Sequence, residues 1–277
     1  MEIELINTGY FMLDGGAMFG VVPKSLWQRT NPANENNLCP WALRSLLIKD
    51  GNRAILIDNG IGDKQSARFF SHYYLHGDDS LIGNMLKAGI NDADITDMML
   101  THLHFDHCGG GIKRQGEHLV PTFGNATYWS NEAHWQWATK PNQREKASFL
   151  SENILPMQES GHLKFLALEN QQELPFDIIF VDGHTDKQML PKIAYKGQIL
   201  VFVADLLPSV GHIPLAYVMG YDTRPLITMD EKARFLSEAA DNNYILVFQH
   251  DSVNECCTVQ HTEKGVRVDQ IFPFSEL

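Results

Sequence analysis

The chain has 277 residues, of which 44% are hydrophobic and 20% charged, and its formal net charge is −12. This length suits one large domain with a substantial core, and the composition excludes a disordered chain. The negative charge disfavours nucleic acid and anionic membranes as partners, and no segment approaches the roughly 20 apolar residues of a membrane span.

The N-terminus and the cysteines bear on the cellular compartment. Residues 1–5 lack the basic and apolar regions of a signal peptide. The four cysteines include the neighbours Cys256 and Cys257, and none of them forms a Cys-x-x-Cys pattern. A disulfide framework is therefore not expected, and we predict a cytoplasmic protein.

The first 60 residues favour strands. One strand begins at Ile3, and two apolar segments at 42–49 and 53–58 flank Asp50-Gly51, which is a strong hairpin signal. Helices are predicted further along the chain. Their residues are 80–88 with Gly89 as the C-cap, most of 131–168, and 230–241.

Four further apolar segments predict buried strands, and each is followed by a histidine or an aspartate. These strands are expected at residues 95–100, 178–181, 198–204 and 244–248. The order is strands first and then β–α alternation, with no internal repeat or linker. We therefore predict one domain, residues 1–277, of the α/β class, with a shared site at the carboxyl ends of its strands.

The segment Thr101–Gly110 is the most informative stretch. His102, His104, Asp106 and His107 place four potential metal ligands within six residues, directly after a predicted strand. A loop can turn neighbouring side chains toward one point, whereas a regular strand sends alternate residues to opposite faces. Imidazole and carboxylate groups suit zinc and related ions such as manganese, iron or cobalt.

Three more candidate ligands stand at the ends of separate predicted strands. Seven ligands exceed the needs of one tetrahedral zinc, so we expect two divalent ions that share a bridging carboxylate, with zinc favoured. The candidate metal ligands are His102, His104, Asp106, His107, His184, Asp205 and His250.

These residues resemble the motifs of the metallo-β-lactamase-fold hydrolases. The matching blocks are Thr101–Gly110, Gly183-His184-Thr185, Ala204-Asp205-Leu206 and His250-Asp251. Upstream, residues 56–60 are similar to the family's strand that ends in Asp-x-Gly. Residues 14–20 and 212–214 resemble the branch of N-acyl-homoserine lactonases and methyl-parathion-hydrolase-like enzymes.

The resemblance implies a four-layer αββα sandwich, with two mixed β-sheets flanked by helices. Carried over by position, a first ion is bound by His102, His104 and His184, a second by Asp106, His107 and His250, and Asp205 bridges them. Asp58 and Thr101 are expected to orient ligand imidazoles. Asp106 or Asp205 is expected to take the proton released when water attacks the substrate.

Two positions depart from the family pattern. Asp186-Lys187-Gln188 follows His184-Thr185 where the family commonly has Pro-Gly-His, and Pro208 stands where homoserine lactonases have a tyrosine. A tyrosine-assisted lactonase mechanism therefore does not transfer directly. Tyr217 and Tyr221 in the following loop remain alternatives.

The favoured function is a lactonase-like hydrolase of a small-molecule lactone, ester or phosphotriester. A di-iron redox protein on the same fold, a thioester or phosphodiester hydrolase, and a non-catalytic binding protein stay open as alternatives. An antibiotic β-lactamase is disfavoured because Asp205 stands where many such enzymes have cysteine, and because no signal peptide is evident.

Three further features have more than one interpretation. The first is the pair His72 and His76, which are four residues apart and lie beside several aromatic residues. This pattern favours an aromatic surface or lid over a second metal site. His212 either lines the pocket or packs internally. The apolar residues Met18, Phe19 and Trp27 belong to the core, to the wall of a substrate pocket or to an oligomer contact. Because the last alternative is open, a homodimer is one of the expected oligomeric states.

Overall fold

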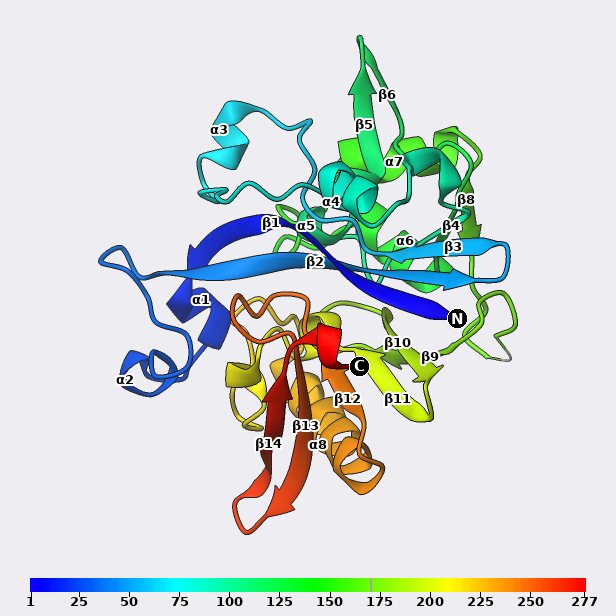
Figure 1. Cartoon of the computed structure of the whole chain (residues 1–277). Helices are drawn as coiled ribbons and strands as arrows, with labels where there is room; N and C mark the ends of the chain where they lie inside the picture. The colour runs from blue at the N-terminus through cyan, green and yellow to red at the C-terminus, as the bar shows by residue number, and fades with distance from the viewer. Residues whose placement is uncertain (170) are drawn as a thin grey trace. The chain divides into compact units, whose positions relative to one another are not determined.

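The computed structural model describes residues 1–169 and 171–277. The chain divides into two compact units: unit 1 comprises Met1–Tyr10 and Leu43–Glu173, and unit 2 comprises Phe11–Ala42 and Leu174–Leu277. The boundary falls within two long strands, β1 (Glu2–Asp14) and β2 (Leu38–Asp50). Figure 1 labels the elements of both units.

Unit 1 contains most of a six-stranded sheet with the order β1-β2-β3-β4-β7-β8. Its later strands are β3 (Arg53–Ile57), β4 (Asp97–Met99), β7 (Thr127–Ser130) and β8 (Leu163–Phe165). These four run parallel to one another, whereas β2 and β3 form an antiparallel hairpin. The predicted hairpin is confirmed: Asp50 pairs with Arg53, and Gly51 adopts the positive φ of 59° that the tight turn requires.

The helices of unit 1 are short. They are α3 (Ala67–Phe70), α4 (Leu81–Lys87), α5 (Phe105–Cys108), α6 (Glu132–Thr139) and α7 (Ser151–Glu159). The 3-10 turns are η1 (Asp92–Asp94) and η2 (Gly109–Gly111), and β5 (Ile112–Gln115) pairs with β6 (His118–Pro121). Helix α4 confirms the prediction for residues 80–88, because the Ser80 hydroxyl caps its first turn and Gly89 follows its end with a φ of 73°.

The prediction that residues 131–168 are mostly helical was wrong. Only α6 and α7 are helical there, and β8 lies in the same stretch. Lys140 precedes Pro141, and the residue before a proline disfavours the helical region, so α6 ends there. The Asn142 side chain then accepts hydrogen bonds from the backbone N–H groups of Arg144 and Glu145, which stabilises a turn instead.

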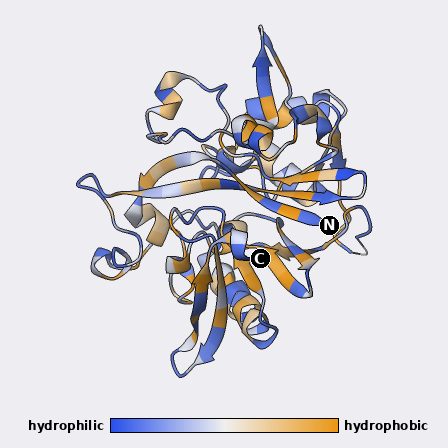
Figure 2. Cartoon of the chain, viewed as in Figure 1, coloured by the Kyte–Doolittle hydropathy of each residue, from blue (hydrophilic) through white to orange (hydrophobic). Residues whose placement is uncertain are grey.

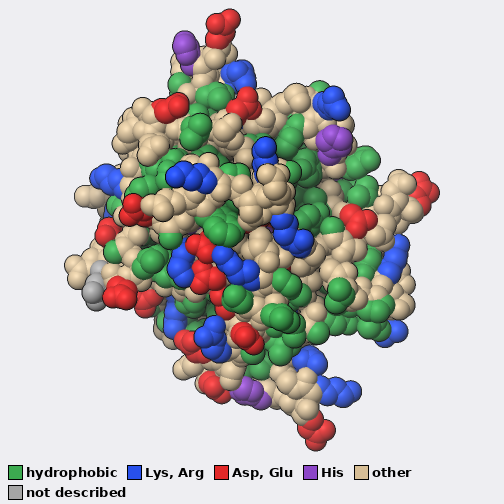
Figure 3. Space-filling view, turned by 180° about the vertical axis from the view of Figure 1, so that it is seen from behind, with side chains coloured by type: hydrophobic (Ala, Val, Ile, Leu, Met, Phe, Trp, Pro, Cys, Tyr) green, Lys and Arg blue, Asp and Glu red, His purple; other side chains and the backbone are tan. Residues whose placement is uncertain are grey.

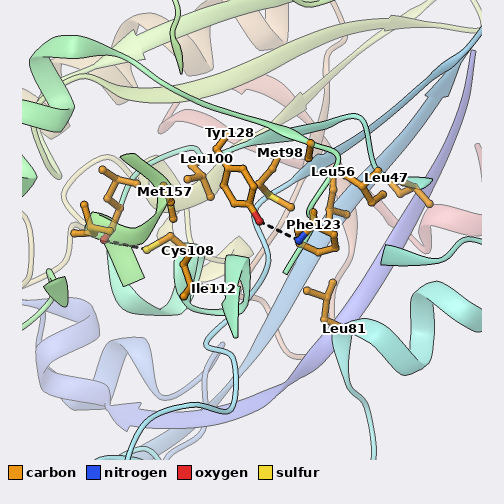
Figure 4. Close-up of a cluster of buried hydrophobic side chains, with 14 of the residues drawn as sticks. Leu47, Leu56, Leu81, Met98, Leu100, Cys108, Ile112, Phe123, Tyr128 and Met157 are labelled. Atoms are coloured by element: carbon orange, nitrogen blue, oxygen red, sulfur yellow. Dashed lines mark hydrogen bonds between the residues drawn. The ribbon is translucent and has the colours of Figure 1, made fainter. Parts of the chain in front are cut away.

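The core of unit 1 contains buried side chains from its sheet and its helices, shown in Figure 4. The Tyr128 hydroxyl donates to the Gly111 carbonyl (2.6 Å) and accepts from the Phe123 N–H (3.1 Å). The thiol of Cys108 donates to the Leu103 carbonyl (3.3 Å), and both residues are fully buried. Leu103, inside the His-x-His-x-Asp-His segment, and Cys108, directly after it, are therefore core residues that anchor its loop.

Unit 2 contains a six-stranded mixed sheet with the order β14-β13-β12-β11-β10-β9. Its strands are β9 (Asp177–Val181), β10 (Gln188–Tyr195), β11 (Gln198–Phe202), β12 (Ile245–Val247), β13 (Cys256–Thr262) and β14 (Gly265–Phe272). Strands β11 and β12 are parallel, and the other neighbours are antiparallel. In Figure 2 the strands carry long hydrophobic stretches, whereas the tip of the β5–β6 hairpin in unit 1 is hydrophilic.

The helices of unit 2 are α1 (Gly15–Phe19), α2 (Lys24–Trp27) and α8 (Pro225–Asp241), with 3-10 turns η3 (Ala204–Leu206), η4 (Val210–His212) and η5 (Phe274–Glu276). Helix α8 begins five residues before its predicted start, with Pro225 in its first turn, where a proline has no intrahelical N–H bond to lose. It buries Phe235, Leu236 and Ala239.

The predicted α/β class, with mixed sheets and helices, is confirmed. The predicted strands are present but mostly shorter: residues 95–100 contain the three-residue β4, because Ile95 still belongs to the end of η1. Among the described residues, no helix has the length and apolar character needed to cross a bilayer. On the face shown in Figure 3, acidic and basic side chains are interspersed. The single-domain boundary of 1–277 stays a prediction.

Candidate metal centre

The four clustered ligands of unit 1 follow strand β4 at its carboxyl end. The strand ends at Met99, and His102, His104, Asp106 and His107 lie in the loop and in helix α5. A side chain from helix α6 also stabilises the loop, because Nε2 of His134 accepts a hydrogen bond from the Leu103 N–H (2.9 Å). The hydrogen bond of Leu103, a residue between the candidate ligands, therefore helps to fix the path of the loop.

The first two imidazoles of this loop face each other. Nε2 of His102 lies 3.0 Å from Nδ1 of His104. The Thr101 hydroxyl donates to Asp58 (2.7 Å), so its oxygen accepts from Nδ1–H of His102 (3.2 Å), which places the lone pair of that ring on Nε2. Nε2 of His104 lies 3.4 Å from Oε1 of the buried Glu145. These partners direct one ring nitrogen of each histidine toward the other.

Asp58 holds the third imidazole of this loop. Its Oδ2 accepts from Nδ1 of His107 (2.9 Å), and its Oδ1 accepts from the Thr101 N–H (2.8 Å). The other ring nitrogen, Nε2 of His107, lies 3.7 Å from Oδ2 of Asp106. The orienting contacts predicted for Asp58 and Thr101 are therefore present.

The three candidate ligands of unit 2 converge although they follow three different strands. Nε2 of His184, after β9, lies 3.1 Å from Oδ2 of Asp205, and Nε2 of His250, after β12, lies 3.1 Å from Oδ1 of the same carboxylate. Nδ1 of His184 is held by Asp222 Oδ1 (3.0 Å), and Nδ1 of His250 by the backbone carbonyl of Ala42 (2.8 Å).

This arrangement needs a positive charge between its members. With both Nδ1 hydrogens donated outward, two Nε2 lone pairs and one carboxylate face one another. Burial would lower the pKa of His184, but the charges and hydrogen bonds of Asp205 and Asp222 raise it to about 10. A metal ion competes with a proton for such a position, because its imidazole and carboxylate ligands must be deprotonated. The donor set of unit 2 therefore fits a metal ion.

Both loops that carry candidate ligands contain a glycine at a position where the chain passes too close to neighbouring backbone for any side chain. A Cβ added at Gly109, just after the ligands of unit 1, would lie 2.1 Å from the Ile61 carbonyl oxygen. A Cβ added at Gly183, just before His184, would lie 2.3 Å from the Thr228 nitrogen. Neither contact is possible without a backbone shift.

Aromatic side chains from residues 67–74 contact Phe105, which lies inside the ligand loop of unit 1. The ring centroids of Tyr73 and Phe69 lie 4.7 and 5.3 Å from that of Phe105. Burial, together with the charge of Asp106, raises the pKa of Tyr73 to about 12. This is the predicted aromatic surface, and its role as a lid stays a prediction.

His72 and His76 do not share a helical face, because α3 ends at Phe70. The ring of His76 instead stacks on Tyr10, with a centroid distance of 5.7 Å and an interplanar angle of 30°. Spacing of four residues was therefore misleading here, since it has this meaning only inside a helix.

His212 packs internally in unit 2. Its Nε2–H donates to the Met18 carbonyl (2.8 Å), and its Nδ1 accepts from the Ser209 hydroxyl (2.9 Å). Its ring stacks on Phe19 at 4.3 Å, and Phe19 stacks on Trp27 at 5.3 Å. Burial lowers the pKa of His212 to about 3, so this histidine is neutral at physiological pH.

Met18, Phe19 and Trp27 are accordingly buried core residues of unit 2, which supports the core interpretation of residues 18–27. Tyr217 lies edge-on to Phe19, with a centroid distance of 6.3 Å, and Tyr221 is exposed.

The sequence did not reveal three of the groups that orient candidate ligands: Glu145, Asp222 and the carbonyl of Ala42. Neither acidic residue stands in a recognisable motif, and a backbone carbonyl has no signature at all.

Comparisons with known proteins agree with this picture. The family model of the metallo-β-lactamase superfamily matches residues 43–250, a range that includes all seven candidate ligands. No curated protein matches the chain significantly.

Several solved structures are similar over nearly the whole chain. A probable metal-dependent hydrolase from Staphylococcus aureus is 27% identical, with a TM-score of 0.88 over 100% of this chain and 98% of that chain. AidC, a dizinc quorum-quenching lactonase in complex with the product N-hexanoyl-L-homoserine, is 20% identical, with a TM-score of 0.80 over 98% and 95%. An N-acyl homoserine lactone hydrolase with N-hexanoyl-L-homoserine bound at its catalytic metal centre is 16% identical, with a TM-score of 0.67 over 90% and 92%.

Proposed function

The chain belongs to the metallo-β-lactamase superfamily of hydrolases, and from that premise we propose that it uses two metal ions to hydrolyse a lactone, an ester or a phosphotriester, with a lactone favoured. The observation that carries this proposal is the pair of donor sets. In each unit, imidazoles are held by a partner on one ring nitrogen and present the other toward a further ligand.

The assignment of ligands to ions follows the family resemblance. His102, His104 and His184 would hold one ion, and Asp205 would bridge to the second. The second ion would be held by Asp106, His107 and His250. Zinc is favoured because nitrogen and carboxylate ligands suit it, and because the similar lactonase AidC is a dizinc enzyme.

Bound divalent ions supply Lewis acidity, which polarises a substrate oxygen and lowers the pKa of water from 15.7 toward about 7. The residues of the chain contribute orientation and proton transfer. Asp58, Asp222 and the Ala42 carbonyl fix the Nδ1 hydrogens of His107, His184 and His250, so that Nε2 is the ring nitrogen that would bind an ion in each.

Asp106 or Asp205 would accept the proton released when water attacks the substrate. A Ser or Cys nucleophile is not needed for this route. Burial raises the pKa of the Cys108 thiol far above its ordinary value, so this cysteine beside the ligands is not a thiolate.

The lactone preference is supported by two similar structures that contain N-hexanoyl-L-homoserine, the ring-opened product of a lactone. Pro208 stands where lactonases of that branch have a tyrosine, so the contacts that select a substrate differ. A panel of substrates on protein of known metal content tests this part. It compares acyl-homoserine lactones, aryl esters, phosphotriesters, phosphodiesters and glutathione thioesters. A clear preference for phosphodiesters or thioesters would overturn the lactonase assignment and leave the metal site standing.

The metal site is tested by His104→Ala. We expect this variant to lose metal and to abolish hydrolysis, because it removes a proposed ligand. His118→Ala, at an exposed histidine on β6, is the matched control and should keep both. Wild-type turnover of the His104 variant with unchanged metal content would contradict the assignment. Iron with a visible spectrum in anaerobically purified protein would instead favour the redox alternative.

A further inference from the structure

Unit 1 contains a cavity of about 440 Å³, within the range of small-molecule sites. It lies between residues 8–10 of β1, the loop after β3, residues 75–82 and strand β5. None of the residues that line it is a proposed metal ligand. Asn59 and Gly110 line the cavity, and the Asn59 N–H donates to the His107 carbonyl (2.9 Å), so the cavity backs onto the ligand loop.

Asn59 provides a buried acceptor that lacks a partner. Its side chain is 1% exposed, and its Nδ2 contacts the sulfur of Met98 at 3.3 Å. Within the described part of the chain, Oδ1 of Asn59 accepts no hydrogen bond. Buried amide oxygens are almost always hydrogen-bonded, so this one indicates a donor that a ligand would supply.

The charged groups that line the cavity are mainly acidic. Asp63 and Asp79 are two carboxylates, against one ammonium group on Lys113. Lys113 is already paired with Asp92, at 3.2 Å between Nζ and Oδ2. The lining therefore carries negative charge that is not compensated by its own lysine.

The contacts of the other polar groups add to this excess of acceptors. Asp79 accepts from the neutral amides of Asn7 (2.8 Å) and Asn84 (2.7 Å), which leave its charge in place. Nδ1 of His76 donates to the Tyr74 carbonyl at 3.0 Å and not to either carboxylate of the lining. A ligand for this cavity must bring N–H donors and positive charge.

Apolar groups supply the rest of the lining. Ile61, Leu81 and Ile112 are buried side chains, and Leu75 and Ile82 are partly exposed. The aromatic ring of Tyr10, stacked on His76, also lines the cavity. Such a surface suits a short hydrocarbon stem and can interact with a cation through the tyrosine ring.

We propose that this cavity binds a small organic cation with N–H donors on its head and a short apolar stem, such as an alkylguanidinium or an alkylammonium ion. The head pairs with Asp63 and Asp79 and donates to Asn59, and the stem packs against Leu81 and Ile82.

The test is calorimetric titration of the metal-loaded full chain with butylguanidinium. This probe is permanently charged and has no free lone pair, so coordination to a metal cannot produce the signal. Butylurea has a similar shape without the charge, and pentanoate has the opposite charge. We expect saturable binding of one butylguanidinium per chain, weaker binding of butylurea and none of pentanoate. Absence of butylguanidinium binding, or equal binding of pentanoate, would overturn the proposal.

Three variants locate the site. Ile82→Trp fills the cavity from a partly exposed position and should weaken binding by at least about tenfold, since the stem loses its place. Asp63→Asn should weaken it by about threefold, as expected for one exposed ion pair. Asp78→Asn is the matched control, because Asp78 is exposed and does not line the cavity, and it should bind normally. Unchanged affinity in both folded cavity variants would also overturn the proposal.

Discussion

The two candidate donor sets are assembled in different ways. In unit 1 the ligands are neighbours in sequence, and a single anchored loop presents them. In unit 2 they follow three separate strands, and they converge only because β9, β11 and β12 belong to the same sheet. The first set depends on local loop geometry, whereas the second depends on the integrity of the whole sheet.

The groups that orient the imidazoles differ as well. In unit 1 the partners are side chains, with Asp58 holding His107 and Glu145 lying against His104. In unit 2, Asp222 holds His184, but His250 is held by the backbone carbonyl of Ala42. A side-chain partner can be removed by one substitution, whereas a carbonyl cannot. The orientation of His250 therefore depends on the path of strand β2.

Glycine substitutions should break both loops, with the largest expected effect on stability. Gly109→Ala and Gly183→Ala each force a Cβ into neighbouring backbone, and we expect each to lower the free energy of unfolding by about 3 kcal/mol. Gly124→Ala is the control, because no atom lies within 4 Å of its added Cβ. Urea unfolding measures the three variants. A Gly109 variant as stable as the Gly124 variant would show that the loop can relax.

Removing the carboxylate partners should weaken metal binding without removing a ligand. In Asp58→Asn, an amide donor faces Nδ1–H of His107 and favours the wrong ring tautomer, and Asp222→Asn does the same to His184. We expect about 10- to 100-fold weaker metal binding in each. The loss should be larger for Asp58, which also holds Thr101.

Competition with a chelator measures these affinities, and activity at saturating metal separates binding from chemistry. Asp92→Asn is the matched control, since Asp92 forms its ion pair with Lys113 and not with a candidate ligand, and it should leave metal affinity unchanged. If Asp58→Asn kept wild-type affinity while Asp222→Asn lost it, the two sets would differ in more than the origin of their partners.

The candidate ligands could be identified from the sequence, whereas the residues that orient them could not. His102 to His107 have a short-range spacing, and His184, Asp205 and His250 stand where apolar strands end, so local patterns reveal them. Glu145 and Asp222 act through contacts that only the folded chain creates. The same limit explains the error at residues 131–168, where a helix-forming composition was interrupted by one proline and one asparagine turn.

Acid should distinguish the units through His212, which supports unit 2 without being a proposed ligand. Its pKa in the folded chain is about 3, below the ordinary value of 6.5, so the unfolded chain binds more protons between these values. The stabilisation by neutral His212 is therefore complete above pH 6.5 and is lost as the pH falls toward 3, by up to about 1.4 kcal/mol per pH unit.

His212→Asn, which cannot titrate, should be clearly less stable than wild type at pH 7, and this difference should shrink at pH 5. Urea unfolding at both pH values gives the difference, with His118→Asn in unit 1 as the control. A wild-type-to-His212→Asn difference that is the same at both pH values would mean that the buried ring accepts its proton without disturbing the stack on Phe19.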